Sequence, residues 1–154
     1  MVDLASVAAA RAGIDNVDFI EGLAEELPLG DQSVDVVITN GVLHLCPDKQ
    51  LVLSELRRVL RPGGSVFGAD TLIERIPPRS SRDLIFRWTK CVVGAFTPDT
   101  LRAALEVAGF DEIQLRSPID VFDGARGEAN ADHYAANGWT FSARRPVAET
   151  VLIK

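Results

Sequence analysis

The sequence predicts a single α/β domain built around a mostly parallel sheet. Strand-like and helix-like segments alternate along most of the chain, and residues 34–39 (VDVVIT) are apolar on both faces, as suits a central parallel strand covered by helices. Near the C-terminus, residues 111–117 (DEIQLRS) and 139–145 (WTFSARR) fit an antiparallel strand pair. A chain of 154 residues is long enough to bury the core of one such domain.

The N-terminal region begins with a helical pattern and continues with a strand-like segment. Small apolar residues recur at helical spacing through Val2–Ala12, and Gly13 ends the pattern. We expect a short strand at residues 17–20 (VDFI), followed by a polar loop at residues 23–33 (LAEELPLGDQS). The apolar strand VDVVIT follows this loop.

A second helix and a second central strand come next. Apolar residues in Pro47–Leu60 fall at helical spacing, and the run Arg-Pro-Gly-Gly at residues 61–64 ends the helix. Residues 65–72 (SVFGADTL) then form a strand-like segment. After the proline pair at residues 77–78, an apolar pattern over Leu84–Val93 predicts a helix, which we place over one face of the sheet.

The C-terminal half carries the clearest helix signal in the chain. Thr97 is a typical N-cap residue and Pro98 suits the first helical position, so these residues open a helix that Gly109 closes. Residues 122–138 (FDGARGEANADHYAANG) are rich in Gly, Ala, Asn and Asp. We expect them to form a long loop between the last two strands.

Composition argues against several classes of partner. The net charge is −6 and the 16 basic residues are scattered, so we predict no nucleic-acid partner. No apolar run approaches the roughly 20 residues that span a bilayer, so we predict no membrane association. The N-terminus shows no secretory signal, and a cytoplasmic location is the expectation. Cys46 and Cys91 cannot form a zinc site by themselves, and we predict no resident metal.

A candidate site follows the strand at residues 34–39. Ligands of open α/β sheets bind outside the carboxyl ends of the strands, which directs attention to TNGVLHLCPDK at residues 39–49. Asn40 and Gly41 lie where a backbone can approach a ligand closely, while His44 and Cys46 follow in the adjoining turn. His44 can serve as a general base or be a hydrogen-bonded structural histidine, and Cys46 can equally be a small buried side chain.

The order of these segments resembles the class I S-adenosylmethionine-dependent methyltransferases. The resemblance rests on LPLGDQSVDVV, TNGVLHL, LRRVLRPGG and TPDTLRAALEVAGF, and it covers most of the chain. Within that superfamily, NGVLHLCPDK, WTKCVVGAF and FDGA look like segments of arsenite methyltransferases and their close relatives.

The resemblance implies a Rossmann-like sheet with strand order 3-2-1-4-5-7-6 and S-adenosylmethionine lying across the ends of strands 1, 2 and 4. The glycine-rich turn after strand 1 has no counterpart in this sequence, so we expect an incomplete sheet whose first two strands would precede Met1. Asn40 and Gly41 are then expected to face the cofactor, and Leu23 and Ala24 to lie beside its adenine.

The acceptor side is less well defined by the resemblance. His44 or Cys91 would face a small-molecule acceptor as catalytic residues, and Asp70, at the end of the fifth strand, is a further pocket residue. Arsenite enzymes hold trivalent arsenic with cysteine thiolates, and Cys91 matches one such position, whereas Gly41 stands where another cysteine is expected. Cys46 could substitute only with a different geometry, so Cys46 and Cys91 are candidate ligands of arsenic at most.

Two expectations follow from a sheet without strands 1 and 2. The strand VDVVIT would become an open apolar edge, and such edges favour association, so we expect a homodimer through this surface. A sheet without its glycine-rich turn would bind the cofactor weakly. The alternative to a methyltransferase is therefore a non-catalytic, methyltransferase-derived chain that acts as an oligomeric binding module.

Overall fold

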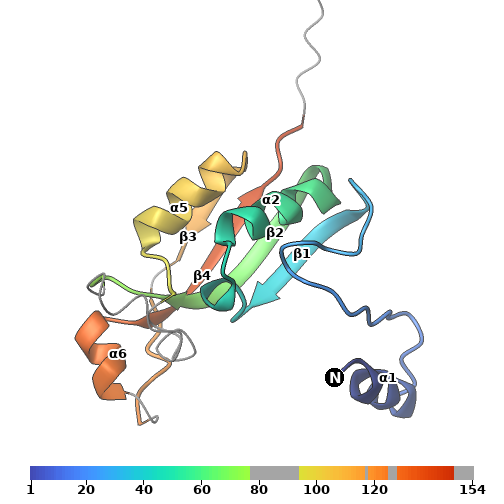
Figure 1. Ribbon diagram of the computed structural model, residues 1–154, viewed down its shortest axis with the longest axis horizontal. Coiled ribbons are helices and arrows are strands. Elements are labelled where there is room, and N and C mark those ends of the chain that lie inside the picture. Colours follow the sequence, from blue (N-terminus) through green and yellow to red (C-terminus); the bar gives the residue numbers. More distant parts are fainter. Residues whose placement is uncertain (77–93, 117, 125–127, 148–154) are drawn as a thin grey trace, which may run out of the picture.

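The computed structural model describes residues 1–76, 94–116, 118–124 and 128–147. Within these residues, four strands form one mixed sheet in the order β1-β2-β4-β3 (Figure 1). They are β1 (Val34–Asn40), β2 (Leu60–Leu72), β3 (Asp111–Leu115) and β4 (Asn137–Arg144). β1 and β2 pair in parallel, whereas β4 pairs antiparallel with both β2 and β3. The order equals the 4-5-7-6 half of the expected sheet, so the α/β class and the antiparallel C-terminal pair are confirmed.

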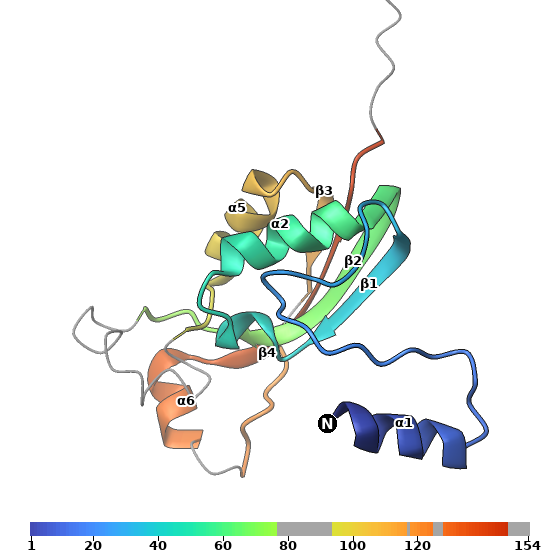
Figure 2. The same cartoon turned by 45° about the vertical axis from the view of Figure 1, so that its right-hand side comes forward.

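Helices cover one face of this sheet. Of the helices that the structure describes, α2 (Lys49–Val59) and α5 (Pro98–Val107) cover this face, and Figures 1 and 2 show them side by side over the strands. A short 3-10 helix, η1 (Leu43–Leu45), follows β1. The helix α1 (Val2–Arg11) lies apart from the sheet and buries none of its side chains.

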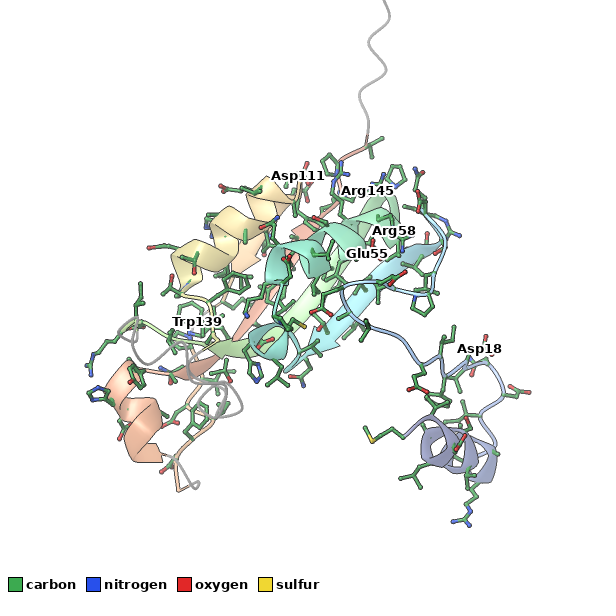
Figure 3. All side chains as sticks on the ribbon, in the orientation of Figure 1. Asp18, Glu55, Arg58, Asp111, Trp139 and Arg145 are labelled. Atoms are coloured by element: carbon green, nitrogen blue, oxygen red, sulfur yellow. The ribbon has the colours of Figure 1, made fainter. Side chains whose placement is uncertain are left out.

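Local capping interactions explain where the covering helices begin and end. Asp48 is the N-cap of α2, and its Oδ1 accepts a hydrogen bond from the Leu51 N–H at 2.9 Å. Thr97 and Thr100 form a reciprocal capping box at the start of α5. At the other end of α2, Arg145 Nη1 donates to Leu60 O at 2.6 Å, which satisfies a carbonyl at the helix terminus (Figure 3). The predicted helices at residues 47–60 and 97–109 are confirmed.

The main core lies between the sheet and these two helices. Alternate residues of β2 point into it, because side chains on a strand face opposite sides in turn. The buried side chains come from β2, β4, α2 and α5, and include Val66, Leu72, Phe141, Leu53, Leu56, Leu101 and Leu105. On the other face of the sheet, Val36, Ile38 and Phe67 are exposed, and Ile38 keeps 81% of its surface accessible.

Two element predictions are wrong. Residues 17–20 form no strand, because a segment of this length needs a hydrogen-bonded neighbour and the described strands lie elsewhere (Figure 2). The sheet was predicted to be mostly parallel, but among the described strands only β1 and β2 pair in parallel. Residues 122–138 are not a continuous loop, since they contain the helix α6 (Glu128–Tyr134), whose Ala131 joins Ala136 and Ile73 in a small buried cluster. The helix predicted at residues 84–93 lies outside the described residues.

In the part of the chain that the structure describes, no helix combines the length and the apolar character needed to cross a bilayer.

Candidate functional site

The candidate site begins at the carboxyl end of β1. Gly41 follows the strand with φ of +66°, a left-handed conformation that favours glycine, and its N–H donates to Ala69 O on β2 at 2.9 Å. This turn directs the chain into η1, whose residues include His44. The local sequence thus ends the strand and brings the following turn against the end of the neighbouring strand.

His44 and Asp70 meet at this position. Nδ1 of His44 lies 2.5 Å from Oδ1 of Asp70, and each residue is only 6% exposed. The Asp70 carboxylate also accepts two backbone hydrogen bonds, from Leu43 N–H to Oδ2 and from Thr71 N–H to Oδ1, both at 2.8 Å. A buried carboxylate requires such partners, because desolvation without hydrogen bonds is costly. Asp70 therefore joins the ends of β1 and β2 through η1.

Cys46 lies at the end of η1 and is buried. Its Sγ donates to Val42 O at 3.4 Å, and burial, followed by the charge of Glu25, raises the pKa of the thiol. Burial lowers the pKa of the nearby Lys49 ammonium, whose Nζ donates to Cys46 O at 2.7 Å. Because the protonated thiol is a poor ligand for soft centres, this environment does not favour arsenic binding by Cys46.

The structure assembles no chelate for a metal among the described residues. Within them, no group of three or more His, Cys, Asp or Glu side chains converges with a geometry that could hold an ion. Cys91, the second candidate for arsenic and for catalysis, lies outside the described residues.

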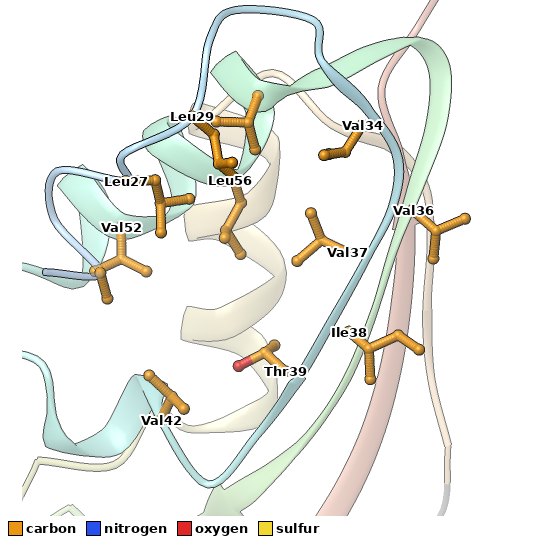
Figure 4. Close-up of a pocket in the computed structure, with 12 residues that line it drawn as sticks. Leu27, Leu29, Val34, Val36, Val37, Ile38, Thr39, Val42, Val52 and Leu56 are labelled. Carbon is orange, nitrogen blue, oxygen red and sulfur yellow. The ribbon is translucent and has the colours of Figure 1, made fainter. Parts of the chain in front are cut away.

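An apolar groove of about 330 Å³ runs beside the open side of β1 (Figure 4). Its walls come from β1, from α2, from the segment before β1 and from the turn between β1 and η1. The lining residues are Ala24, Leu27, Leu29, Val34, Val36, Val37, Ile38, Thr39, Val42, Val52, Leu56 and Val59. The groove is suited to an apolar ligand surface, because nearly all of its lining residues are aliphatic.

The predicted cofactor-side residues are brought together only in part. Ala24 is half-buried, lines the groove and packs against the main core. Leu23 is 66% exposed and lies in a tight turn in which Glu26 N–H donates to Leu23 O at 3.1 Å, so its side chain does not line the groove. Asn40 is exposed at the end of β1, next to Gly41.

Sequence reasoning missed one polar group close to this site. Trp139 on β4 pairs in register with Asp70, and its Nε1 is buried without a hydrogen-bond partner among the described residues. The sequence does indicate where Trp139 points, because the side chains of a strand alternate between its faces and this places Trp139, Phe141 and Ala143 on the same face. The ring therefore belongs to the same side of the sheet as the Asp70 carboxylate.

Comparisons with known proteins identify relatives of this chain. A family model described as a methyltransferase domain matches residues 1–68. An arsenite methyltransferase from Halobacterium salinarum is 35% identical over 153 residues, which are 97% of this chain and 39% of the relative. A malonyl-[acyl-carrier protein] O-methyltransferase from Methylococcus capsulatus is 37% identical over 110 residues, covering 68% of this chain and 38% of that protein. This chain thus spans about two fifths of the length of both relatives.

A solved structure gives a matching result at the level of the fold. The arsenic (III) S-adenosylmethionine methyltransferase from Chlamydomonas reinhardtii superimposes with a TM-score of 0.65 and 29% identity. The match covers 92% of this chain and 50% of that one.

Proposed function

Because the chain belongs to the class I S-adenosylmethionine-dependent methyltransferase family, we propose that it takes part in methyl transfer to a small-molecule acceptor. One observation carries the proposal: His44 and Asp70 meet at the ends of two adjacent parallel strands, directly beyond Asn40 and Gly41. Such strand ends are where open α/β sheets bind their ligands.

S-adenosylmethionine is the cofactor of this family, and when bound it supplies a methyl group on a positively charged sulfur. The residues present fit such a group on the cofactor side. No heavy atom lies within 4 Å of the position where a Gly41 side chain would begin, so a ligand can approach the backbone there. We assign Asn40 and Gly41 to the polar part of the cofactor. Ala24, together with the backbone at Leu23, is assigned to the adenine side.

On the acceptor side, we assign His44 the role of a catalytic residue. Methyl transfer depends mainly on alignment of the acceptor with the methyl group, and a nearby base assists by accepting a proton from the acceptor. Cys91 is kept as a second acceptor-side residue on the strength of the family resemblance. The burial of Cys46, which raises the pKa of its thiol, favours an acceptor other than arsenite, because trivalent arsenic needs converging thiolates.

Calorimetric titration of the whole chain with S-adenosylhomocysteine tests the proposal. We expect saturable but weak binding, with a dissociation constant between the micromolar and millimolar ranges, because the sequence has no counterpart of the glycine-rich turn. An Asn40→Ala variant should bind about fivefold more weakly, the effect of losing one hydrogen bond of about 1 kcal/mol. Gln114→Ala on β3, away from the strand ends, serves as the matched control and should bind normally.

The same titration decides between the methyltransferase and the alternative of a non-catalytic binding module. Absence of binding at millimolar S-adenosylhomocysteine, from a chain that is folded by circular dichroism, would contradict the proposed function. Equal losses in the Asn40→Ala and Gln114→Ala variants would contradict the assignment of Asn40.

A further inference from the structure

We propose that Asp70 is a positioning residue, which holds His44 with its hydrogen on Nδ1 and leaves Nε2 as the base toward the acceptor. This inference rests on the proposed function and deepens it, because a base at this position suits an acceptor that carries an O–H or N–H group.

The contacts of Asp70 define the hydrogen-bond geometry on one side of the ring. An ionised carboxylate accepts hydrogen bonds and cannot donate them, so the hydrogen between Asp70 Oδ1 and His44 belongs to Nδ1. The other oxygen accepts from the N–H of Leu43, the residue that precedes His44. Asp70 thus fixes both the imidazole and the backbone that carries it, and two independent anchors restrict the ring to one orientation.

The second ring nitrogen is left with its lone pair. A neutral imidazole has one donor and one acceptor nitrogen, so a hydrogen on Nδ1 makes Nε2 the acceptor. Among the described residues, the one fully buried side-chain nitrogen or oxygen without a partner is Trp139 Nε1. His44 Nε2 is not among such buried, unpartnered atoms, and the His44 side chain keeps 7% of its surface accessible. This geometry makes Nε2 available to a small molecule at the end of β1.

Imidazole ¹⁵N NMR of the whole chain tests the assignment directly. The sequence contains two histidines, and the exposed His133 on α6 provides an internal reference, which a His133→Gln variant assigns. We expect the neutral His44 ring to show a protonated Nδ1 and an unprotonated Nε2. An Asp70→Ala variant should lose most of this form in favour of the Nε2–H tautomer. A wild-type spectrum with the hydrogen on Nε2, or a folded Asp70→Ala variant with an unchanged spectrum, would overturn the proposal.

A second measurement separates positioning from a purely structural role. Diethyl pyrocarbonate acylates unprotonated imidazole nitrogen, and we expect it to modify His44 in the wild-type chain, detected by mass spectrometry of the peptide. His133 is the reference for a freely exposed ring. If His133 reacts and His44 does not, Nε2 is inaccessible and the proposal fails.

A second, more conservative variant tests the role of Asp70 in case the first one does not fold. If Asp70→Ala does not fold, Asp70→Asn keeps the shape of the side chain while turning one oxygen into a donor, and the same change of tautomer is expected. Failure of S-adenosylhomocysteine to bind would overturn the proposed function but leave the tautomer result standing, so the two failures are distinguishable.

Discussion

Glu55 and Arg58, one turn apart on α2, form a bidentate ion pair in which Nε donates to Oε1 at 2.7 Å and Nη2 donates to Oε2 at 2.8 Å. The pair also holds the segment before β1. Leu27 N–H donates to Glu55 Oε2 at 2.9 Å, and Arg58 Nη1 donates to Leu29 O at 2.8 Å and to Asp31 Oδ1 at 2.7 Å. Two groove-lining residues, Leu27 and Leu29, are thereby fixed against α2.

This ion pair predicts a pH dependence of stability. The hydrogen bond from Arg58 holds the pKa of Glu55 below its ordinary value of 4.5, although burial acts in the opposite direction. A carboxyl whose pKa is lower in the folded state stabilises the fold above the unfolded value, and this contribution disappears as the pH falls through the folded value. We expect Glu55→Gln to lose about 1 kcal/mol at pH 7 and to show a smaller further loss below pH 4.5 than the wild type.

Urea unfolding at stepped pH values measures this effect. Glu106→Gln on α5 is the matched control, since Glu106 is exposed and should leave the pH profile unchanged. Parallel profiles for the wild type and Glu55→Gln would contradict the prediction.

A second prediction concerns the register pair Gly68 and Phe141. The ring of Phe141 occupies the space above Gly68, so a methyl group added there would overlap the ring. We expect Gly68→Ala to destabilise the fold by about 1–3 kcal/mol, the usual effect of overpacking a core, measured by thermal unfolding. Gly30→Ala, at a position with no neighbouring atom within 4 Å, should leave the unfolding midpoint nearly unchanged. Equal midpoints for both variants would show that the core accommodates the added methyl group.

The fold was predictable where the determining interactions are local. The helix α5 is specified by its own Thr97, Pro98 and Gly109, which act within one turn of each helix end. The segment at residues 17–20 has strand-like composition but no neighbouring strand with which to pair. Whether such a strand is present depends on distant parts of the chain and not on the residues of the segment itself. The helix α6 was missed because its Ala131 is buried against a distant residue, Ile73.

The same distinction between local and distant interactions applies to the candidate site. A turn of functional interest after the strand at residues 34–39 was predictable from the general rule on strand ends. The pairing of His44 with Asp70, 26 residues further along the chain, depends on the register of β1 against β2, which side-chain patterns alone do not determine.

A third prediction concerns the reactivity of Cys46. Burial raises the pKa of its thiol, so at pH 8 it should be less ionised and less accessible than a free cysteine. In a Cys91→Ser background, we expect iodoacetamide to alkylate Cys46 roughly tenfold more slowly in the folded chain than in urea. Ser6→Cys on the exposed face of α1, with both native cysteines replaced, is the control and should react at similar rates in both conditions. Fast alkylation of folded Cys46 would contradict its assigned environment.

A fourth prediction concerns the homodimer expected at the open side of β1. Val36 and Ile38 are exposed there, and β1 is one of the two outer strands of the described sheet. Edge strands with apolar side chains favour association. We expect a dimer by light scattering at high micromolar concentration, and a monomer for Ile38→Lys. Val107→Lys on α5 replaces another exposed aliphatic residue and should stay dimeric. A monomeric wild-type chain would contradict the prediction.

The alternation of side chains between the two faces of β2 determines what an error in strand register would do to this protein. Val66, Gly68, Asp70 and Leu72 share one face of the strand, so hydrophobic packing and the carboxylate beside His44 depend on the same register. A slip of one residue would turn Asp70 to the opposite face while also exposing the apolar side chains. A molecule that slips by one residue therefore cannot keep the contact between His44 and Asp70, and the presence of this contact reports on the register of the sheet.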